Sequence, residues 1–260
     1  MTQYLLFTVA APLASFGTVA VGERRPTWDR PSKSQIIGLV AAALGIERRE
    51  EERQRALAVS LGFAVRIDDP GILASDYHTA QAPKAVSIRR RLKAGGPVET
   101  RADELACDDL KTILSRREFR VGSQYTIALW RSSVGEPTLE NIASSLRTPA
   151  FAPFAGRKAH PMMLPMAPRL LETGQIEDAF AAFDVGEPDA IKALKAEQMI
   201  KVRSERPIYA DVAAVAPHER QQRISRLEER RDNPESRAKW RFGLRTEALL
   251  RNPGTDGAGA

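Results

Sequence analysis

The stretch GERRPTWDRPSKSQIIGLVAAALGI, from Gly22 to Ile46, places an arginine pair and two prolines in front of a short apolar segment. Ser32 is a favourable N-cap, and Gln35 three residues later completes a capping box. Gly45 suits the position that follows a helix C-terminus. The apolar residues recur at helical spacing and are Ile36, Ile37, Val40, Ala41, Ala43 and Leu44. The stretch therefore predicts a helix that packs closely against a sheet.

The beginning of this predicted helix is cationic. Lys33 lies in its first turn, and Arg30 lies just upstream. Free backbone N–H groups and the helix dipole favour an anion at such an end. The sequence thus predicts a phosphate seat, whose ligands would be Arg24, Arg25, Ser32, Lys33 and Ser34.

Composition indicates an anionic partner. The chain has 260 residues, a net charge of +6 and 43% hydrophobic residues. Nucleic acid is the commonest partner of a basic chain, and an anionic membrane surface is the rival. No apolar run approaches the roughly 18 residues of a membrane span, and Met1–Ala11 lacks the basic flank of a signal peptide. The single cysteine, Cys107, excludes an internal disulfide and a cysteine-rich zinc site, and it predicts a cytoplasmic protein.

The apolar patterns predict a sheet with two helices and one long excursion. Strands are predicted at Tyr4–Val9, ending at Pro12, at Leu61–Ile67 with one buried face, and at Tyr125–Trp130. Thr138 would cap a second helix. Between the last two strands, residues 79–118 hold few large apolar residues and many cations. A core cannot be built from this composition, so the sequence predicts that the segment leaves the domain.

Later segments carry charge rather than periodic apolar residues. A proline-rich loop over residues 149–168 presents Arg157 and Lys158 beside Gly156. His218–Arg231 is predicted to be a highly charged helix, and Asn252–Ala260 to be disordered. No nucleotide-binding fingerprint occurs, and the three histidines lack metal-ligand spacing. The sequence therefore predicts neither a cofactor nor a metal.

Several pieces, in order, carry a resemblance to a known family. They are LLFTVAAPLASFG, GERRPT and PSKSQIIGLVAAALGI, followed by DYHTAQ, ILSRREFRV and FAPFAGRKAHP. Together they resemble the CasD family of type I-E CRISPR-associated Cascade subunits, which belong to the RAMP superfamily. The resemblance extends to Pro161 and thins beyond Pro168.

The resemblance implies an α+β fold with a ferredoxin-like, RNA-recognition-motif type RAMP domain. Its implied parts are the RAMP domain at residues 1–78 and 119–215, a thumb at 79–118 and a charged C-terminal extension at 216–260. It also implies a non-catalytic subunit that caps the 5′ handle of the CRISPR RNA. The implied partners are the Cascade backbone and large subunits and, through the complex, target DNA. The predicted RNA-binding residues are Arg24, Arg25, Ser32, Lys33, Ser34, Arg89, Arg90, Arg91, Arg116, Arg117, Arg157 and Lys158.

Two alternatives remain open from the sequence. Metal-independent RNA cleavage needs a general base, a general acid and a cation near the scissile phosphate, which Tyr77, His78 and Lys84 would supply. A RAMP subunit of type I-C systems cuts its guide precursor, whereas in type I-E systems a separate endonuclease does so. Membrane binding would need a basic amphipathic helix, and His218–Arg231 has too weak an apolar face for that role.

Overall fold

The computed structural model describes residues 1–18, 20, 22–133, 135–198, 200 and 203–251, and these residues form two compact units. Unit 1 comprises Met1–Phe16, Trp28–Ile72 and the described residues from Arg120 onward. Unit 2 comprises Leu73–Phe119 together with the described residues of Gly17–Thr27. The tail predicted to be disordered, residues 252–260, lies outside the described residues.

The centre of unit 1 is an antiparallel sheet with the strand order β6-β1-β5-β3. Its strands are β1 (Thr2–Ala14), β3 (Leu61–Asp69), the second half of β5 (Leu110–Arg131) and β6 (Arg169–Thr173). Helix α1 (Lys33–Ala43) joins β1 to β3, and α5 (Leu139–Arg147) joins β5 to β6. This β-α-β-β-α-β arrangement is ferredoxin-like. The predicted α+β RAMP-like fold is thereby confirmed.

The C-terminal part of the chain extends this sheet. Beyond β3 the order continues with β7 (Ile208–Asp211), β9 (Arg241–Leu250) and β8 (Ile224–Ser236). The prediction of a charged helix over His218–Arg231 is therefore wrong. Only the short turns η1 (Val212–Ala214), η2 (Pro217–Glu219) and α8 (Arg220–Arg223) come before β8. The alternating charges of β8 belong to a sheet in which inward-facing ions pair with β9.

Helices cover both faces of the central sheet. Helices α1, α5 and α2 (Glu51–Ser60) pack on one face, against Phe7, Phe63 and Ile127 among others. Helix α6 (Ile176–Val185) packs on the other face, against Tyr4 and Trp130. The remaining helix, α7 (Asp189–Glu197), buries Ile191. β3 is accordingly buried on both faces up to Asp68, where the sequence predicted only one buried face.

The first strand continues past its predicted end at Pro12. The Thr8 N–H donates to the Met166 carbonyl, and the Ala10 carbonyl accepts from the Met163 N–H. Backbone groups alternate along a strand, so the Pro12 nitrogen faces this loop and not β5. The ladder with β5 loses no donor at Pro12, and pairing continues to Ala14 and Arg120.

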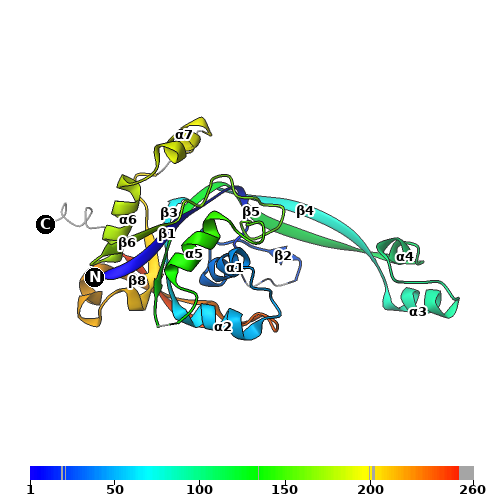
Figure 1. Ribbon diagram of the computed structural model, residues 1–260. Coiled ribbons are helices and arrows are strands. Elements are labelled where there is room, and N and C mark those ends of the chain that lie inside the picture. The colour runs from blue at the N-terminus through cyan, green and yellow to red at the C-terminus, as the bar shows by residue number, and fades with distance from the viewer. Residues whose placement is uncertain (19, 21, 134, 199, 201–202, 252–260) are drawn as a thin grey trace. The chain divides into compact units, whose positions relative to one another are not determined.

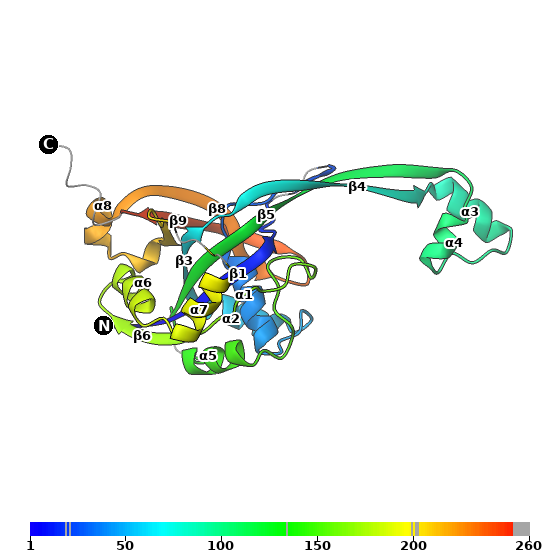
Figure 2. The same cartoon turned by 90° about the horizontal axis from the view of Figure 1, so that it is seen from above.

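Unit 2 is a hairpin with two helices at its end. Its elements are β2 (Arg24–Arg25), β4 (Ile72–Pro83) from Leu73 onward, the first half of β5, α3 (Ala85–Lys93) and α4 (Arg101–Leu105). Figure 2 shows α3 and α4 where β4 ends and β5 begins. Buried side chains here include Ser87 and Cys107, and most others face solvent. The excursion thus spans more of the sequence than residues 79–118, and β2 from the amino-terminal stretch joins it.

Candidate nucleic-acid interface

The beginning of α1 forms as the sequence predicts. The Ser32 side chain accepts from the Gln35 N–H, and the Gln35 side chain accepts from the Ser32 N–H, which completes the capping box. Gly45 has φ +72°, a left-handed conformation that favours glycine. The predicted apolar residues are buried in the core, with Leu44 packed against its edge.

A carboxylate of the chain itself occupies the anion-binding end of α1. The Lys33 backbone N–H donates to Asp232 Oδ2 at 3.0 Å, and Lys33 Nζ donates to Asp211 Oδ2 at 3.1 Å. Arg245 contacts both acids, with Nη1 2.8 Å from Asp211 Oδ1 and Nη2 2.9 Å from Asp232 Oδ2. Asp232 lies on β8, Asp211 on β7 and Arg245 on β9, so this network joins α1 to the C-terminal strands.

A second set of contacts holds Arg30 in the same network. Its Nη2 lies 2.6 Å from Glu247 Oε2, and its guanidinium stacks 3.5 Å from the centre of the Tyr209 ring. Arg230 Nη1 also donates to Glu247 Oε2, at 3.2 Å. Burial opposes ionisation of Glu247, but the charges of Arg230, Arg245 and Arg30 outweigh it and hold its pKa below the usual range.

The predicted phosphate seat requires a correction. Ser32, Lys33 and Ser34 are buried, and the anion that the helix N-terminus favours is supplied by Asp232. These three residues are therefore closed to a phosphate in this structure. The acids responsible lie in the C-terminal strands, which the sequence had assigned to an exposed charged helix and a basic edge strand.

The other arginine pair of this stretch lies in unit 2, beside a second predicted pair. β2 runs parallel to β5, with Arg24 opposite Arg116 and Arg25 opposite Arg117. All four residues are exposed. The structure therefore brings together four predicted RNA-binding residues from two distant parts of the sequence. Like charges at directly opposite positions destabilise a sheet, and a bound polyanion would offset that repulsion.

The arginines of α3 have different roles. Arg89 and Arg90 are exposed. Arg91 is half-buried, and its Nε and Nη1 donate to the carbonyls of Pro97 and Ala106 at 2.9 and 3.2 Å. Arg91 therefore ties α3 to the segment around α4, so only its two neighbours present their side chains to solvent.

The proline-rich loop of unit 1 contains a tight approach to β1. Gly156 has φ +88°, and a Cβ at this position would lie 1.8 Å from the Ser15 carbonyl oxygen. Only glycine fits without displacing the backbone. Next to it, Arg157 is half-buried and Lys158 is exposed. The loop therefore has a defined conformation, with Lys158 as its exposed cation.

The alternative catalytic residues do not converge. Tyr77 and His78 are exposed on β4, and His78 Nε2 lies 3.7 Å from Asp76 Oδ2. Lys84 follows the end of the strand, and its Nζ lies 2.9 Å from both Asp109 oxygens. Six residues of extended chain separate His78 from Lys84, about 20 Å at 3.3 Å per residue. That separation exceeds the hydrogen-bond reach from which an acid, a base and a cation act on one phosphate.

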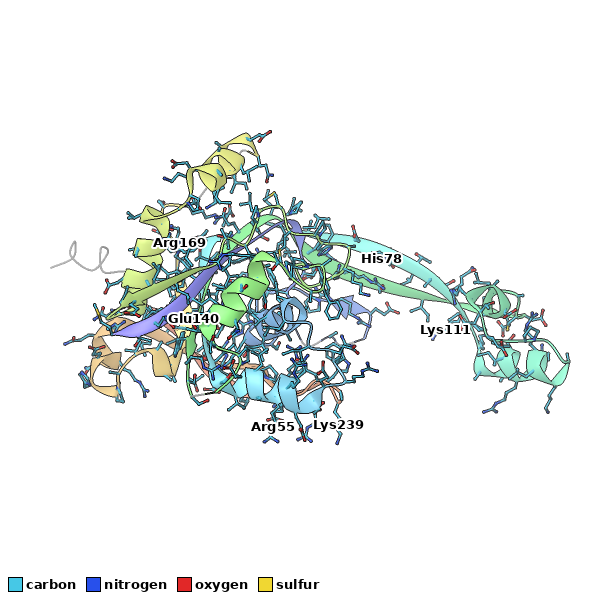
Figure 3. The ribbon with its side chains drawn as sticks, in the orientation of Figure 1. Arg55, His78, Lys111, Glu140, Arg169 and Lys239 are labelled. Carbon is cyan, nitrogen blue, oxygen red and sulfur yellow. The ribbon has the colours of Figure 1, made fainter. Side chains whose placement is uncertain are left out.

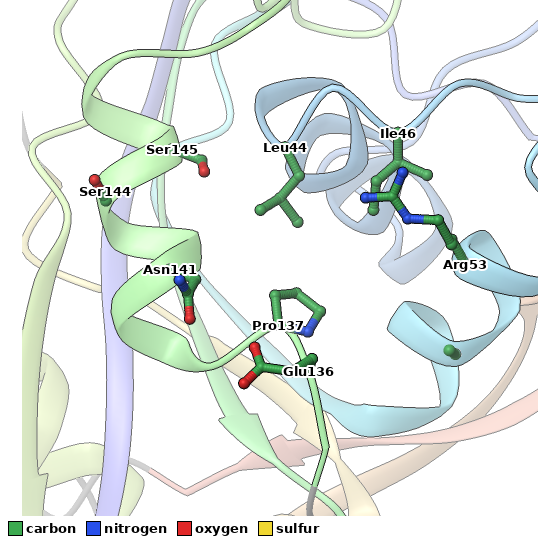
Figure 4. Close-up of a pocket in the computed structure, with 9 residues that line it drawn as sticks. Leu44, Ile46, Arg53, Glu136, Pro137, Asn141, Ser144 and Ser145 are labelled. Atoms are coloured by element: carbon green, nitrogen blue, oxygen red, sulfur yellow. The ribbon is translucent and has the colours of Figure 1, made fainter.

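One further cavity lies in unit 1, between the end of α1, α2 and α5 (Figure 4). Its volume is about 490 Å³. The lining residues are Leu44, Ile46, Arg53, Ala56, Glu136, Pro137, Asn141, Ser144 and Ser145. The lining contains no histidine, no cysteine and none of the predicted site residues. Elsewhere, the described ranges hold no group of three acidic, histidine or cysteine side chains placed to bind a metal. No helix in those ranges is both long and apolar enough to cross a bilayer.

A ferredoxin-like RAMP-type fold with a hairpin that carries opposed arginines defines the class of this protein. Residues 4–246 match the family of CRISPR-associated proteins described as Cas_Cas5, and the chain belongs to that family. The Cascade subunit CasD of Escherichia coli (strain K12) is 28% identical over 166 residues, which cover 64% of this chain and 70% of that protein.

Solved structures share the fold. A chain of a CRISPR RNA-guided surveillance complex aligns with a TM-score of 0.57 and 21% identity, and the match covers 97% of this chain and 95% of that one. A crystal structure of a Cas protein aligns with a TM-score of 0.52 and 23% identity, over 95% and 94% of the two chains. The match therefore covers almost the whole chain, including the C-terminal strands.

Proposed function

We propose that this protein is the non-catalytic RNA-binding subunit of a type I-E Cascade complex and holds the 5′ handle of the CRISPR RNA. The observation that carries the proposal is the parallel register of Arg24 with Arg116 and of Arg25 with Arg117. Four exposed guanidinium groups on two short strand segments suit the phosphates of a single RNA strand. Family membership and the similarity to CasD support the same function.

The partners follow from this proposal. The RNA handle would lie on unit 2, with Arg89, Arg90 and, in unit 1, Lys158 as further exposed cations. The backbone and large subunits of Cascade would bind the remaining surface, and target DNA would be reached through the complex. The protein would act in the cytoplasm, where the guide RNA is made.

The test is retention of guide RNA in a reconstituted complex. Reversing Arg24 and Arg25 together to Glu should lower RNA retention and weaken the salt dependence of binding. Each phosphate contact on a single strand contributes about 0.7 to the slope of log K against log salt, so two lost contacts should lower it by about 1.4. The control reverses Arg55 and Lys239, two exposed cations of unit 1 outside the proposed interface. Equal retention by both double variants would contradict the proposal.

Cleavage of repeat RNA is the alternative function to exclude. The separation of His78 from Lys84 and the pairing of Lys84 with Asp109 favour binding without chemistry. Incubating the pure protein with repeat RNA in the absence of metal should leave the RNA intact. Fragments that disappear in a His78→Ala variant would show that the protein is an endoribonuclease.

A further inference from the structure

Within the proposed function, we propose that the RNA runs along one face of the unit 2 hairpin and that Tyr77 stacks on a base there. We call this the tyrosine face, and it carries Arg24, Arg116, Ser75 and Tyr77. The opposite face carries Arg25, Arg117, Asp76 and His78. The inference rests on the proposed function and adds to it a face and a base-contacting residue.

Contacts between strands define the tyrosine face. Arg24 is paired with Arg116 in the register of β2 and β5. Arg24 Nη2 also lies 3.7 Å from Glu118 Oε1, two residues beyond Arg116 and thus on the same face of β5. Arg116 Nε lies 3.3 Å from the Ser75 hydroxyl, which places Ser75 on this face of β4.

Alternation along β4 then places the aromatic residue. Tyr77 follows Ser75 by two residues, so its side chain lies on the same face, about 7 Å along the strand. The Tyr77 side chain is 68% exposed. A ring exposed to this degree beside two guanidinium groups can stack on an unpaired base while the arginines hold the flanking phosphates. His78, the next residue, lies on the opposite face.

Charge distinguishes the two faces. On the tyrosine face the only carboxylate is Glu118, which is 15% exposed and already bound by Arg24 and the Thr27 N–H. On the opposite face the Asp76 side chain is 56% exposed and would repel a phosphate. Arg25 is also partly committed there, because its Nη1 donates to the Gly22 and Arg24 carbonyls at 2.5 and 3.0 Å.

The first experiment separates stacking from phosphate binding. Full-length protein is titrated with an oligouridylate of about ten nucleotides and with an abasic ribose-phosphate strand of the same length. Tyr77→Leu should weaken oligouridylate binding by about 5- to 100-fold, the usual worth of one stacked base. It should leave abasic binding and the salt slope unchanged, because the arginines remain. Tyr77→Trp should retain binding.

His78→Leu is the matched control, since it removes a neighbouring ring from the opposite face, and it should bind both strands as the wild type does. An unchanged affinity in Tyr77→Leu, or an equal loss for both strands, would overturn the assignment of Tyr77.

The second experiment tests the face itself. Arg24→Gln with Arg116→Gln should lower both the affinity and the salt slope, whereas Arg25→Gln with Arg117→Gln should leave both near the wild-type values. The reverse result would overturn the tyrosine face while leaving RNA binding by this hairpin intact. If neither arginine pair matters, or if the wild type binds neither strand, the proposed function itself fails.

Discussion

The Lys33 backbone N–H donates to the Asp232 carboxylate across 3.0 Å and joins the first residue of α1 to β8. Arg245 completes the contact with two hydrogen bonds to the same carboxylate, both of 2.9 Å. An isolated helix N-terminus of this kind would attract an external anion. Here the C-terminal hairpin fills it, so the hairpin contributes to the stability of the central domain.

The first prediction concerns that carboxylate. Asp232→Ala should lower the free energy of unfolding by about 3 to 5 kcal/mol, because it leaves the buried Arg245 guanidinium without one of its partners. Asp232→Asn should cost less, since the amide oxygen can still accept from the Lys33 N–H. Chemical denaturation measures both. Glu235→Ala, at an exposed position on the same strand, should change stability by less than about 0.5 kcal/mol. A loss in Asp232→Ala no larger than in this control would show that the network does not stabilise the fold.

The second prediction is a dependence of stability on pH. Burial raises the pKa of Asp232, but hydrogen bonding and charge from Arg245 outweigh burial and hold the pKa below its ordinary value. The unfolded state therefore takes up protons first as the pH falls. Stability from Asp232 is fully present above about pH 4, the unfolded pKa, and is lost as the pH falls through the folded pKa.

Denaturation between pH 6 and the acid limit should show this loss, at up to about 1.4 kcal/mol per pH unit for each proton taken up. Asp232→Asn should flatten the slope, whereas Asp189→Asn, whose side chain is 98% exposed, should leave it unchanged. Parallel slopes for wild type and Asp232→Asn would rule out a depressed pKa at this carboxylate.

Local interactions made part of this structure predictable from sequence. The capping box at Ser32 and Gln35 and the glycine at Gly45 act within one helix turn, so their letters suffice. The partner of the same helix end, Asp232, lies 199 positions further along the chain. No local pattern indicates such a contact. The buried charges of β8 and β9 hid those strands for the same reason, because ions that pair across a sheet read as exposed residues in sequence.

The candidate interface was predictable in composition but not in geometry. Arg24 and Arg25 stood out as one cationic cluster and Arg116 and Arg117 as another. Their parallel register depends on β2, which has only two residues and no periodicity to detect. Tyr77 was visible as an aromatic residue, but its face follows from the contact between Arg116 and Ser75.

The third prediction concerns the loop that presents Lys158. Gly156→Ala should destabilise the protein by about 1 to 3 kcal/mol, because alanine is strained at φ +88° and its Cβ would meet the Ser15 carbonyl. Thermal unfolding measures the loss. Gly174→Ala is the control, because no atom lies within 4 Å of the added Cβ and no positive φ is involved. Equal melting temperatures for the two variants would show that the loop does not require its close approach to β1.

The fourth prediction is that unit 1 folds without the hairpin of unit 2. Where the hairpin leaves the sheet, Asp69 still pairs with Gln124, and a Cβ at Gly71 would lie 2.4 Å from the Val121 carbonyl oxygen. The two chains are thus close enough for a tight connection. Replacing Leu73–Phe119 by Asn-Gly, which favours a two-residue hairpin turn, should preserve cooperative unfolding while abolishing RNA binding.

Circular dichroism and denaturation test the fold of that variant, and titration with oligouridylate tests binding. The control deletion extends to Thr126 and removes Tyr125, which is fully buried in the core; it should not fold. Loss of cooperative unfolding in the shorter deletion would mean that the hairpin is part of the folding core of unit 1. Full RNA binding by a folded deletion variant would place the RNA on unit 1, because the opposed arginines of β5 and their neighbours in β4 would then be absent.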